Sequence, residues 1–247
     1  MIQIEDVTKV FGKVEAVSRT SFRIPEGILC GLVGSDGAGK TTLLKMVATM
    51  VRPTAGRILV GGHDVVKVKD KAKALIGYMP QRFGLYHDLT VEENLNFFMD
   101  IYGIFGAERR KRKDTYLGFS NLLPFLGRLA GDLSGGMKQK LGLACVLVHE
   151  PKVLILDEPT NGVDPVSRQE FWDILAEMKR KGMTLFVSTV YLDEGEKCDR
   201  LILMHRSRVL EASSPQEIQA HFPDLEEAMI QRIQEVDKAL IHERFIP

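Results

Sequence analysis

The sequence predicts an α/β fold with an inserted helical segment, and three observations support this prediction. Short apolar runs of strand length alternate with stretches in which apolar residues recur at helical spacing. A glycine-rich loop, GSDGAGKTT (34–42), follows one of the most apolar runs and precedes a helical pattern. A long segment, residues 83–150, has helical periodicity and no clear strand. The chain of 247 residues, 45% of them hydrophobic and 27% charged, has a globular composition and can bury a sizeable core.

The predicted strands flank the helical segment on both sides. Residues 2–7 and 20–24 alternate apolar and polar side chains, which is typical of strands with one buried face. Residues 28–33 form a nearly continuous apolar run, which is typical of a strand covered on both faces. The other candidate strands are residues 57–60, 76–79, 153–156, 184–188, 201–204 and 208–210.

Capping patterns mark where several helices begin. Thr90 with Glu93 predicts a capping box that opens a helix over residues 91–102. Ser214 with Glu217, and Pro215 at the first helical position, predicts a second, short helix. Apolar residues at helical spacing predict further helices, which are residues 43–51, an amphipathic helix over 138–148, and a C-terminal helix of mixed charge over 224–240.

Charge and cysteine content exclude several classes of protein. The 33 basic and 33 acidic residues give no net charge, so no overall field favours nucleic acid or an anionic membrane. The three cysteines are widely spaced and fit neither a zinc site nor a disulfide framework, which favours a reducing compartment. We also expect no membrane span and no secretory signal, because the longest apolar runs are short and the first residues carry acids.

The glycine-rich loop, called the phosphate loop from here on, fits the pattern G-x-x-x-x-G-K-[ST]. Its glycines let backbone N–H groups converge on phosphate oxygens, because a Cβ atom there would block the approach. We expect Lys40 to reach the β- and γ-phosphates and the Thr41 hydroxyl to bind Mg²⁺. A plain glycine-rich turn would not explain the strand before the loop and the helix after it. The expected nucleotide contacts are Gly34, Ser35, Asp36, Gly37, Ala38, Gly39, Lys40, Thr41 and Thr42.

Two carboxylates, Asp157 and Glu158, follow the apolar residues 153–156. A buried strand that ends in an acid places it where open α/β sheets bind ligands. We expect Asp157 to hold Mg²⁺ through water and Glu158 to polarise the attacking water. A strand followed by Asp is common, but together with the phosphate loop it indicates a P-loop nucleoside triphosphatase.

A third motif, LSGGM (133–137), helps to identify the family of P-loop nucleoside triphosphatases that the chain resembles. Ser134 before Gly135 and Gly136 is, by itself, as typical of an N-cap and a turn as of a ligand site. Its position before the strand at 153–156 favours the ligand site. With this motif in place, the chain resembles the nucleotide-binding domain of ABC transporters over almost all of its length. LSGGM is similar to the family signature LSGGQ, with Met137 in place of the last residue.

Other family landmarks follow in the expected order. Phe11 stands where family members stack an aromatic ring on adenine, Gln81 in YMPQ resembles the Q-loop glutamine, and NGVD (161–164) resembles the D-loop. Considered alone, Phe11 also fits a strand-end core aromatic, and Asp164 before Pro165 also fits a helix N-cap. The resemblance implies catalytic roles for Glu158, Lys40 and Gln81, Mg²⁺ ligation by Thr41, Gln81 and Asp157, and further ATP contacts by Phe11, Ser134, Gly135, Gly136 and Asp164.

The resemblance also implies an architecture and an assembly. The implied fold is a P-loop NTPase core with a mixed sheet, an N-terminal antiparallel β-subdomain and an inserted α-helical subdomain. An ABC ATPase domain would span 1–220, with its core at 1–82 and 151–220 and the helical subdomain at about 83–150, followed by a C-terminal helical tail over 221–247. Two cassettes would stack head to tail, as a homodimer or as a heterodimer with another cassette. Each ATP would then lie between one phosphate loop and the other cassette's signature.

The implied cofactors are ATP and Mg²⁺, and the implied partners are integral-membrane permease subunits and no nucleic acid. The expected location is the cytoplasm, peripheral on the cytoplasmic face of the inner (cell) membrane. An apolar loop patch, residues 82–86 with Leu89, fits either local packing beneath the helix at Val91 or a groove for a permease helix.

Residue 190 departs from the family pattern. The family has a histidine after the strand that follows the D-loop helix, in a pattern like S-T-H, and this chain has Val190 there. Valine cannot donate a hydrogen bond to the γ-phosphate. Losing one such contact costs about 2–4 kcal/mol, or roughly a hundred- to a thousandfold in rate. We therefore expect slow hydrolysis, or dependence on a second, complete cassette.

The resemblance is closest to ATP-binding subunits of bacterial exporters of the drug-resistance type, which predicts an ATP-hydrolysing subunit that powers multidrug efflux. An ATP-binding regulatory module with little hydrolysis and one half of a two-cassette ATPase are the alternatives. A soluble ABC protein that acts on ribosomes or DNA is disfavoured, because such proteins usually carry two cassettes or basic insertions.

Overall fold

Two β-sheets enclose the helix that follows the phosphate loop. The computed structural model describes residues 1–220 and 222–245. A six-stranded sheet has the order β10-β9-β3-β8-β7-β6, and a four-stranded sheet has the order β2-β1-β4-β5. The strands are β1 (Ile2–Phe11), β2 (Val14–Ile24), β3 (Leu29–Gly34), β4 (Ala55–Val60), β5 (His63–Asp64), β6 (Ile76–Met79), β7 (Val153–Asp157), β8 (Thr184–Thr189), β9 (Arg200–His205) and β10 (Arg208–Ser213).

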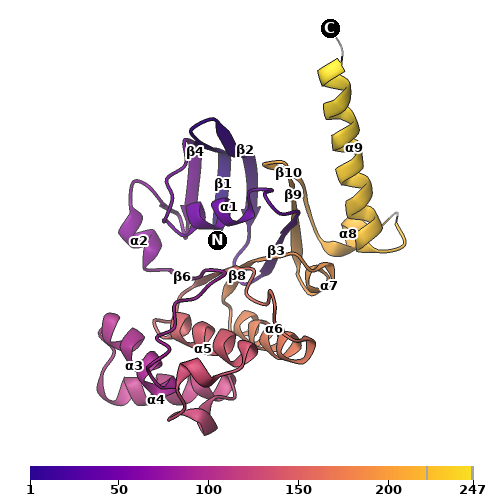
Figure 1. Ribbon diagram of the computed structural model, residues 1–247. Coiled ribbons are helices and arrows are strands. Elements are labelled where there is room, and N and C mark those ends of the chain that lie inside the picture. The colour runs from indigo at the N-terminus through magenta and orange to yellow at the C-terminus, as the bar shows by residue number, and fades with distance from the viewer. Residues whose placement is uncertain (221, 246–247) are drawn as a thin grey trace.

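Helices cover both faces of the larger sheet (Figure 1). The first helix, α1, lies between the two sheets, and the lower part of the molecule in Figure 1 is helical. The helices are α1 (Lys40–Val47), α2 (Lys69–Lys73), α3 (Val91–Ile101), α4 (Gly106–Phe119), α5 (Gly135–Leu147), α6 (Pro165–Arg180), α7 (Leu192–Gly195), α8 (Pro215–Gln219) and α9 (Leu225–Phe245).

The larger sheet is mixed and the smaller one is antiparallel, as the family resemblance implies. Strand β3 pairs in parallel with β8 and β9, β7 pairs in parallel with β6 and β8, and β10 runs antiparallel to β9. Successive β3 side chains alternate between two cores. Leu29 and Val33 pack with α5 and α6, whereas Cys30 and Leu32 pack with α1 and the smaller sheet. Burial on both faces explains why this strand is a continuous apolar run.

Two predicted helices have corrected limits. Helix α1 begins at Lys40, immediately after the phosphate loop, and ends at Val47, because Thr49 has a left-handed φ of 64°. Helix α5 begins at Gly135 and includes both signature glycines. The prediction that this helix is amphipathic is wrong, because residues 140–148 are all buried between the sheet and the other helices. Apolar side chains therefore occupy every face of its second half.

The antiparallel strands β1 and β2 are each longer than predicted. Their pairing shifts register at several positions, and Asp6 and Arg19 both have positive φ angles. Each shift moves the following side chains to the other face of the sheet. The regular alternation is therefore lost along the distal half of the hairpin, which explains why the sequence pattern ends early.

Both predicted capping boxes are present. The Thr90 side chain accepts from the Glu93 N–H at 3.2 Å, and the Glu93 carboxylate accepts from the Thr90 N–H at 2.8 Å. Ser214 and Glu217 form the same reciprocal pair at the start of α8. The short elements β5, α2 and α7 have no such boundary signal, and the sequence does not predict them.

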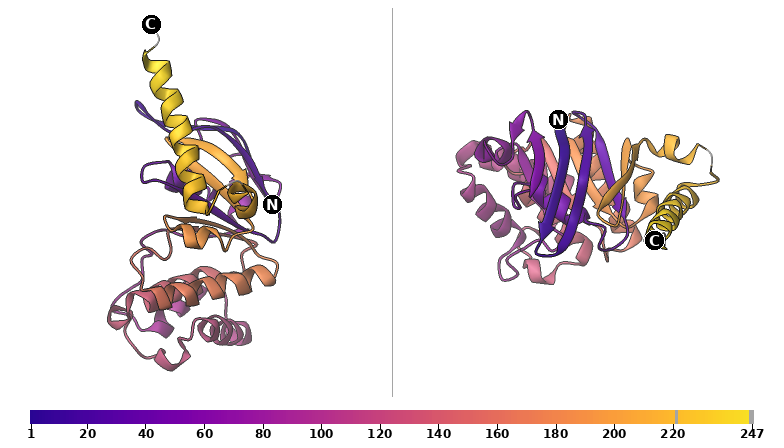
Figure 2. Two further views of the ribbon diagram at one scale, coloured as in Figure 1. Left: turned by 90° about the vertical axis from the view of Figure 1, so that its right-hand side faces the viewer. Right: turned by 90° about the horizontal axis from the view of Figure 1, so that it is seen from above.

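The C-terminal helix α9 extends along β9 and β10 and projects beyond the smaller sheet (Figure 2). Residues 221, 246 and 247 of the predicted tail lie outside the described residues. Within the described part, no helix has both the length and the apolar character needed to cross a bilayer. The three cysteines, Cys30, Cys145 and Cys198, are buried and form no disulfide among the described residues.

Candidate nucleotide-binding site

The phosphate loop forms one wall of a pocket of about 480 Å³ beside the carboxyl edge of the larger sheet. Gln81, after β6, and Glu158, after β7, reach the same pocket from the other side. The residues that line it are Val14, Glu15, Ala16, Asp36, Gly37, Ala38, Gly39, Lys40, Thr41, Thr42, Gln81, Glu158 and Ser207. The structure therefore brings together predicted site residues that lie more than 100 positions apart in the chain.

The local geometry of the phosphate loop suits an anion. Gly39, which precedes α1, has a φ of 104°, and a Cβ atom there would lie 2.2 Å from the Ala16 carbonyl oxygen. This position therefore requires glycine. The following helix begins at Lys40 and points its N-terminal N–H groups toward the loop, which favours negative charge.

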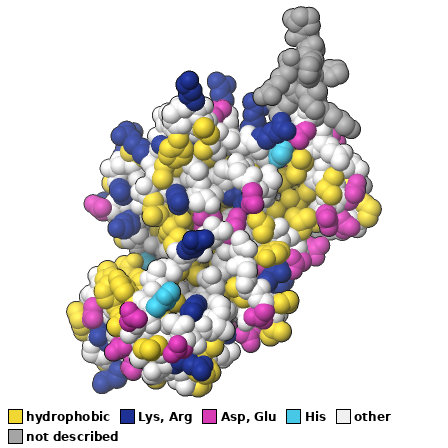
Figure 3. Space-filling model, in the orientation of Figure 1, with side chains coloured by type: hydrophobic (Ala, Val, Ile, Leu, Met, Phe, Trp, Pro, Cys, Tyr) yellow, Lys and Arg dark blue, Asp and Glu magenta, His cyan; other side chains and the backbone are white. Residues whose placement is uncertain are grey.

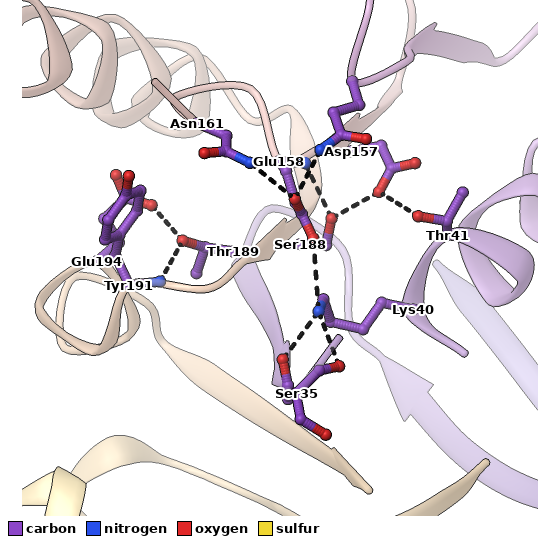
Figure 4. A network of polar contacts seen from close by, with 12 residues as sticks. Ser35, Lys40, Thr41, Asp157, Glu158, Asn161, Ser188, Thr189, Tyr191 and Glu194 are labelled. Carbon is purple, nitrogen blue, oxygen red and sulfur yellow. Dashed lines mark hydrogen bonds and ion pairs between the residues drawn. The ribbon is translucent and has the colours of Figure 1, made fainter. Parts of the chain in front are cut away.

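Lys40 supplies the cation of the pocket. Its side chain is only 4% exposed, and its ammonium donates to the carbonyl oxygens of Gly34 and Ser35 at 2.8 and 3.2 Å. The same ammonium lies 3.4 Å from a carboxylate oxygen of Glu158. A charged amine held in this way is preorganised toward the space in front of the loop (Figure 4).

Thr41 and Asp157 form an oxygen donor set. The Thr41 hydroxyl donates to Asp157 Oδ1 at 3.1 Å, and the Ser188 hydroxyl donates to the same oxygen at 2.9 Å. Carboxylate and hydroxyl oxygens are hard ligands, and Mg²⁺ binds through one or two of them together with phosphate oxygens and water. The residues present therefore fit the expected Mg²⁺ ion.

Glu158 lies at the centre of the polar network in Figure 4. Its backbone has a φ of 47°, a left-handed conformation that non-glycine residues rarely adopt and that surrounding contacts must hold. Its N–H donates to the Ser188 hydroxyl at 2.9 Å. Its carboxylate accepts from Gln81 Nε2 at 2.9 Å and from Asn161 Nδ2 at 3.3 Å.

Phe11 is next to the pocket through its strand partner Val14 and is not itself among the lining residues. It ends β1, is 50% exposed, and pairs across the hairpin with Val14, which lines the pocket. The Lys9 ammonium lies 4.6 Å from its ring centroid. Phe11 is therefore not a core aromatic.

The signature residues lie on a different surface from the pocket. Ser134 caps α5 by accepting from the Met137 N–H at 3.3 Å, and Gly136 packs closely against α6. A Cβ atom on Gly136 would lie 2.4 Å from the Ser167 side chain. Asp164 caps α6, and the hydrogen bond from the Ser167 N–H, at 2.9 Å, lowers the pKa of Asp164 below its usual 3.8. The signature and D-loop motifs thus form one continuous surface.

Val190 follows β8 and is 38% exposed. The segment around it is held by the buried carboxylate of Glu194, which accepts from the hydroxyls of Thr160, at 2.7 Å, and Thr189. Arg168 pairs with the same carboxylate at 3.1 Å and places its guanidinium 3.8 Å from the Tyr191 ring centroid. These contacts hold the backbone on both sides of Val190 in place.

Sequence reasoning missed three residues of the site. Ser188 joins Asp157 to Glu158, and a serine at the end of a buried strand was the available signal. Ser207 lines the pocket from the β9–β10 turn and belongs to no motif. Tyr78, paired with Ile155 across β6 and β7, has a buried hydroxyl without a hydrogen-bond partner among the described residues. Burial, and then the charge of Asp157, raise the pKa of Tyr78.

The chain is similar in sequence to several known proteins. A family model described as "ABC transporter" matches residues 17–161. The probable multidrug ABC transporter ATP-binding protein YbhF of Escherichia coli is 51% identical over 200 residues, which cover 81% of this chain and 35% of YbhF. The chain thus corresponds to about a third of the length of that relative. The linearmycin resistance ATP-binding protein LnrL of Bacillus subtilis is 36% identical over 211 residues, or 85% of this chain and 68% of LnrL.

A solved structure also matches. It is the dimeric ATP-binding cassette MJ0796 in a post-hydrolysis state bound to ADP and Pi, with a TM-score of 0.77 and 25% identity. The superposition covers 87% of this chain and 98% of that one. The mixed α/β architecture predicted for a P-loop NTPase is therefore confirmed.

Proposed function

Because the chain belongs to the ABC transporter family, we propose that it binds and hydrolyses ATP to power a membrane exporter of the drug-resistance type. The observation that carries this proposal is the convergence of Lys40, the Thr41–Asp157 pair and the Gln81–Glu158 pair on one pocket. A cation, an Mg²⁺-binding oxygen set and a candidate general base are the parts that phosphoryl transfer to water requires.

Each group has a distinct task in this mechanism. Bound Mg²⁺ would supply charge neutralisation at the phosphates, held by Thr41 and by Asp157, and by Gln81 in the closed state. Lys40 would exchange its carbonyl contacts for phosphate oxygens. Glu158 would accept a hydrogen bond from the attacking water and orient it toward the phosphorus atom. Gln81 and Asn161 already bind the Glu158 carboxylate and would keep it aimed into the pocket.

Dimerisation would complete the site. Ser134, Gly135 and Gly136 open α5 away from the pocket of their own chain, so their N–H groups are available to a second cassette's γ-phosphate. Phe11 would stack on the adenine, and Asp164 would lie at the same dimer interface. ATP binding would then close the dimer, and hydrolysis would release it, which is a population shift between two states.

An apolar face on the helical subdomain would meet the permease. Tyr86, Phe97 and Ile101 are 47%, 36% and 60% exposed, and the Tyr86 and Phe97 rings pack edge to face at 4.6 Å. Figure 3 shows hydrophobic side chains gathered on the α3 side of this subdomain. Phe83 and Leu85 instead pack against the core, so local packing accounts for that part of the predicted patch. This arrangement would hold the chain at the cytoplasmic face of the membrane.

A second candidate function rests on Val190. Without a histidine donor, this cassette would bind ATP and turn it over slowly, while a complete partner cassette carries most of the hydrolysis. The partner would be a separate chain or a second cassette in a longer polypeptide.

ATP hydrolysis by the purified chain, measured across protein concentrations, tests both candidates. A rate that rises more than proportionally with concentration, and is lost in Glu158→Gln, supports a self-sufficient homodimer. Tight ATP binding without turnover supports the second candidate. Failure of the chain to bind ATP, or equal binding by Lys40→Ala, contradicts both.

A further inference from the structure

The turn between β9 and β10 lies between the phosphate loop and the C-terminal helix. Its two central residues, Arg206 and Ser207, have φ angles of 43° and 69°. Two-residue hairpin turns with positive φ at both positions usually contain glycine or asparagine. Because neither Arg206 nor Ser207 is one of these residues, neighbouring contacts must hold the turn in this conformation.

On one side, Ser207 attaches the turn to the nucleotide pocket. Its N–H donates to the Ala38 carbonyl oxygen of the phosphate loop at 3.1 Å, and its hydroxyl donates to the Glu15 carbonyl oxygen at 2.6 Å. The Ser18 N–H donates to the Ser207 carbonyl oxygen at 2.7 Å. Ser207, Ala38 and Glu15 all line the pocket, so movement of the turn would move the pocket edge.

On the other side, Asp237 attaches the turn to α9. Its Oδ1 atom lies 2.9 Å from His205 Nε2 and 3.2 Å from Arg206 Nε. The other ring nitrogen of His205, Nδ1, lies 3.5 Å from the Ser35 hydroxyl of the phosphate loop. The His205 and Asp237 side chains are 11% and 31% exposed, so this contact is partly shielded from solvent.

We propose that Asp237 is a positioning residue for the nucleotide pocket, which acts through His205 and Arg206 on the β9–β10 turn. The proposal rests on the proposed function, because it assumes that the pocket binds a nucleotide. Coupling between two sites is reciprocal, so a nucleotide that binds better when α9 is docked also holds α9 docked. The C-terminal helix would thereby sense whether the pocket is filled.

The expected size of the effect follows from the exposure of these groups. Asp237 makes one partly exposed ion pair, with Arg206, and one hydrogen-bond contact, with His205, and contacts of this kind each contribute little. Loss of both contacts should weaken nucleotide binding by about three- to tenfold, and a tenfold change corresponds to about 1.4 kcal/mol. An effect of this size is measurable without loss of the fold.

The test compares Asp237→Ala with Glu235→Ala in the full chain. Glu235 is on the same helix, is 64% exposed and pairs with Arg232 of that helix, so its variant is a control that removes the same charge from α9 without touching the turn. MgADP is the probe, because its binding can be measured without turnover. We expect Asp237→Ala to raise the dissociation constant about three- to tenfold, Glu235→Ala to leave it unchanged, and Asp237→Glu to restore part of the affinity.

Hydrogen exchange of the α9 amides separates positioning from a general structural role. MgADP should slow exchange in α9 of the wild type and of Glu235→Ala, but not of Asp237→Ala. His205→Gln should weaken binding to a similar degree, and the His205→Gln/Asp237→Ala double variant should weaken it no further. Additive losses, equal affinities for the two alanine variants, or α9 exchange that ignores MgADP would overturn the proposal. A wild-type chain that fails to bind MgADP would instead contradict the proposed function itself.

Discussion

Replacing Val190 with histidine should accelerate ATP hydrolysis. Val190 is 38% exposed, so a larger side chain can be accommodated without displacing the core. The backbone on either side is held, since the Tyr191 N–H donates to the Thr189 hydroxyl at 3.0 Å. Ser188, which binds both Asp157 and the Glu158 N–H, lies two residues earlier, or about 7 Å along an extended chain. We therefore expect a histidine at this position to reach the γ-phosphate of an ATP bound in the pocket.

The magnitude follows from the contact that is added. A preorganised donor to a transition-state oxyanion is worth about 2.7–4 kcal/mol, or roughly a hundred- to a thousandfold in rate. Partial exposure at residue 190 lets water compete for the donor and reduces this value. We therefore expect Val190→His to raise kcat by roughly tenfold to a hundredfold, equivalent to about 1.4–2.7 kcal/mol. The affinity for ATP should change little, because the contact strengthens mainly as charge develops on the phosphate.

Steady-state hydrolysis and equilibrium ATP binding are the measurements. Val190→Phe is the control, because phenylalanine is aromatic and of similar size but carries no N–H donor. A rise in kcat below twofold for Val190→His, with binding and thermal stability unchanged, would refute the reasoning. An equal rise for Val190→Phe would show that side-chain bulk, and not the hydrogen bond, limits the rate.

Three further predictions concern stability. Gly136→Ala should lower the free energy of unfolding by about 1–3 kcal/mol, because its Cβ atom would lie 2.4 Å from the Ser167 side chain, and chemical denaturation would show it. Tyr78→Phe should leave the free energy of unfolding within about 0.5 kcal/mol of wild type or raise it, since the hydroxyl is buried and unpaired among the described residues; a clear loss would reveal a hydrogen bond to Asp157. Asp164 has a lowered pKa, so its charged cap stabilises the fold above pH 3.8 and is lost as pH falls through its folded-state pKa. The melting temperature of Asp164→Asn should therefore approach that of wild type below the folded-state pKa of Asp164. A difference between the two melting temperatures that does not change with pH would contradict this reasoning.

The sequence predicts those parts of the fold whose signals are local. Strand β6 has the predicted limits, and the Thr90–Glu93 capping box starts α3 at the predicted residue, because each depends on a few adjacent side chains. The pattern fails along β1 and β2, where register shifts change which side chains face the core. It also fails for α5, where burial on every face removes the amphipathic pattern.

The candidate site likewise contains residues that the sequence predicts and residues that it does not. The phosphate loop and the carboxylates Asp157 and Glu158 are short motifs whose chemistry can be read from adjacent residues. Ser188, Ser207 and Asp237 belong to no motif. Ser188 joins Asp157 to the Glu158 N–H, Ser207 lines the pocket, and Asp237 contacts the β9–β10 turn, because elements that are far apart in the sequence lie side by side in the fold. The contribution of such residues depends on tertiary structure, which residue spacing does not encode.

Glu194 holds in place the segment that carries Val190. A fully buried carboxylate is costly unless every partner is present, and Glu194, with 0% exposure, has Thr160, Thr189 and Arg168. These contacts tie the segment that carries Val190 to the D-loop and to α6, so the geometry that would present a histidine is retained. In the proposed mechanism, Val190 lowers turnover through its chemistry and not through folding, because only a hydrogen-bond donor is lost. We expect such a site to bind ATP and to close a dimer, with its turnover restored either by one substitution or by a partner cassette that supplies a complete site.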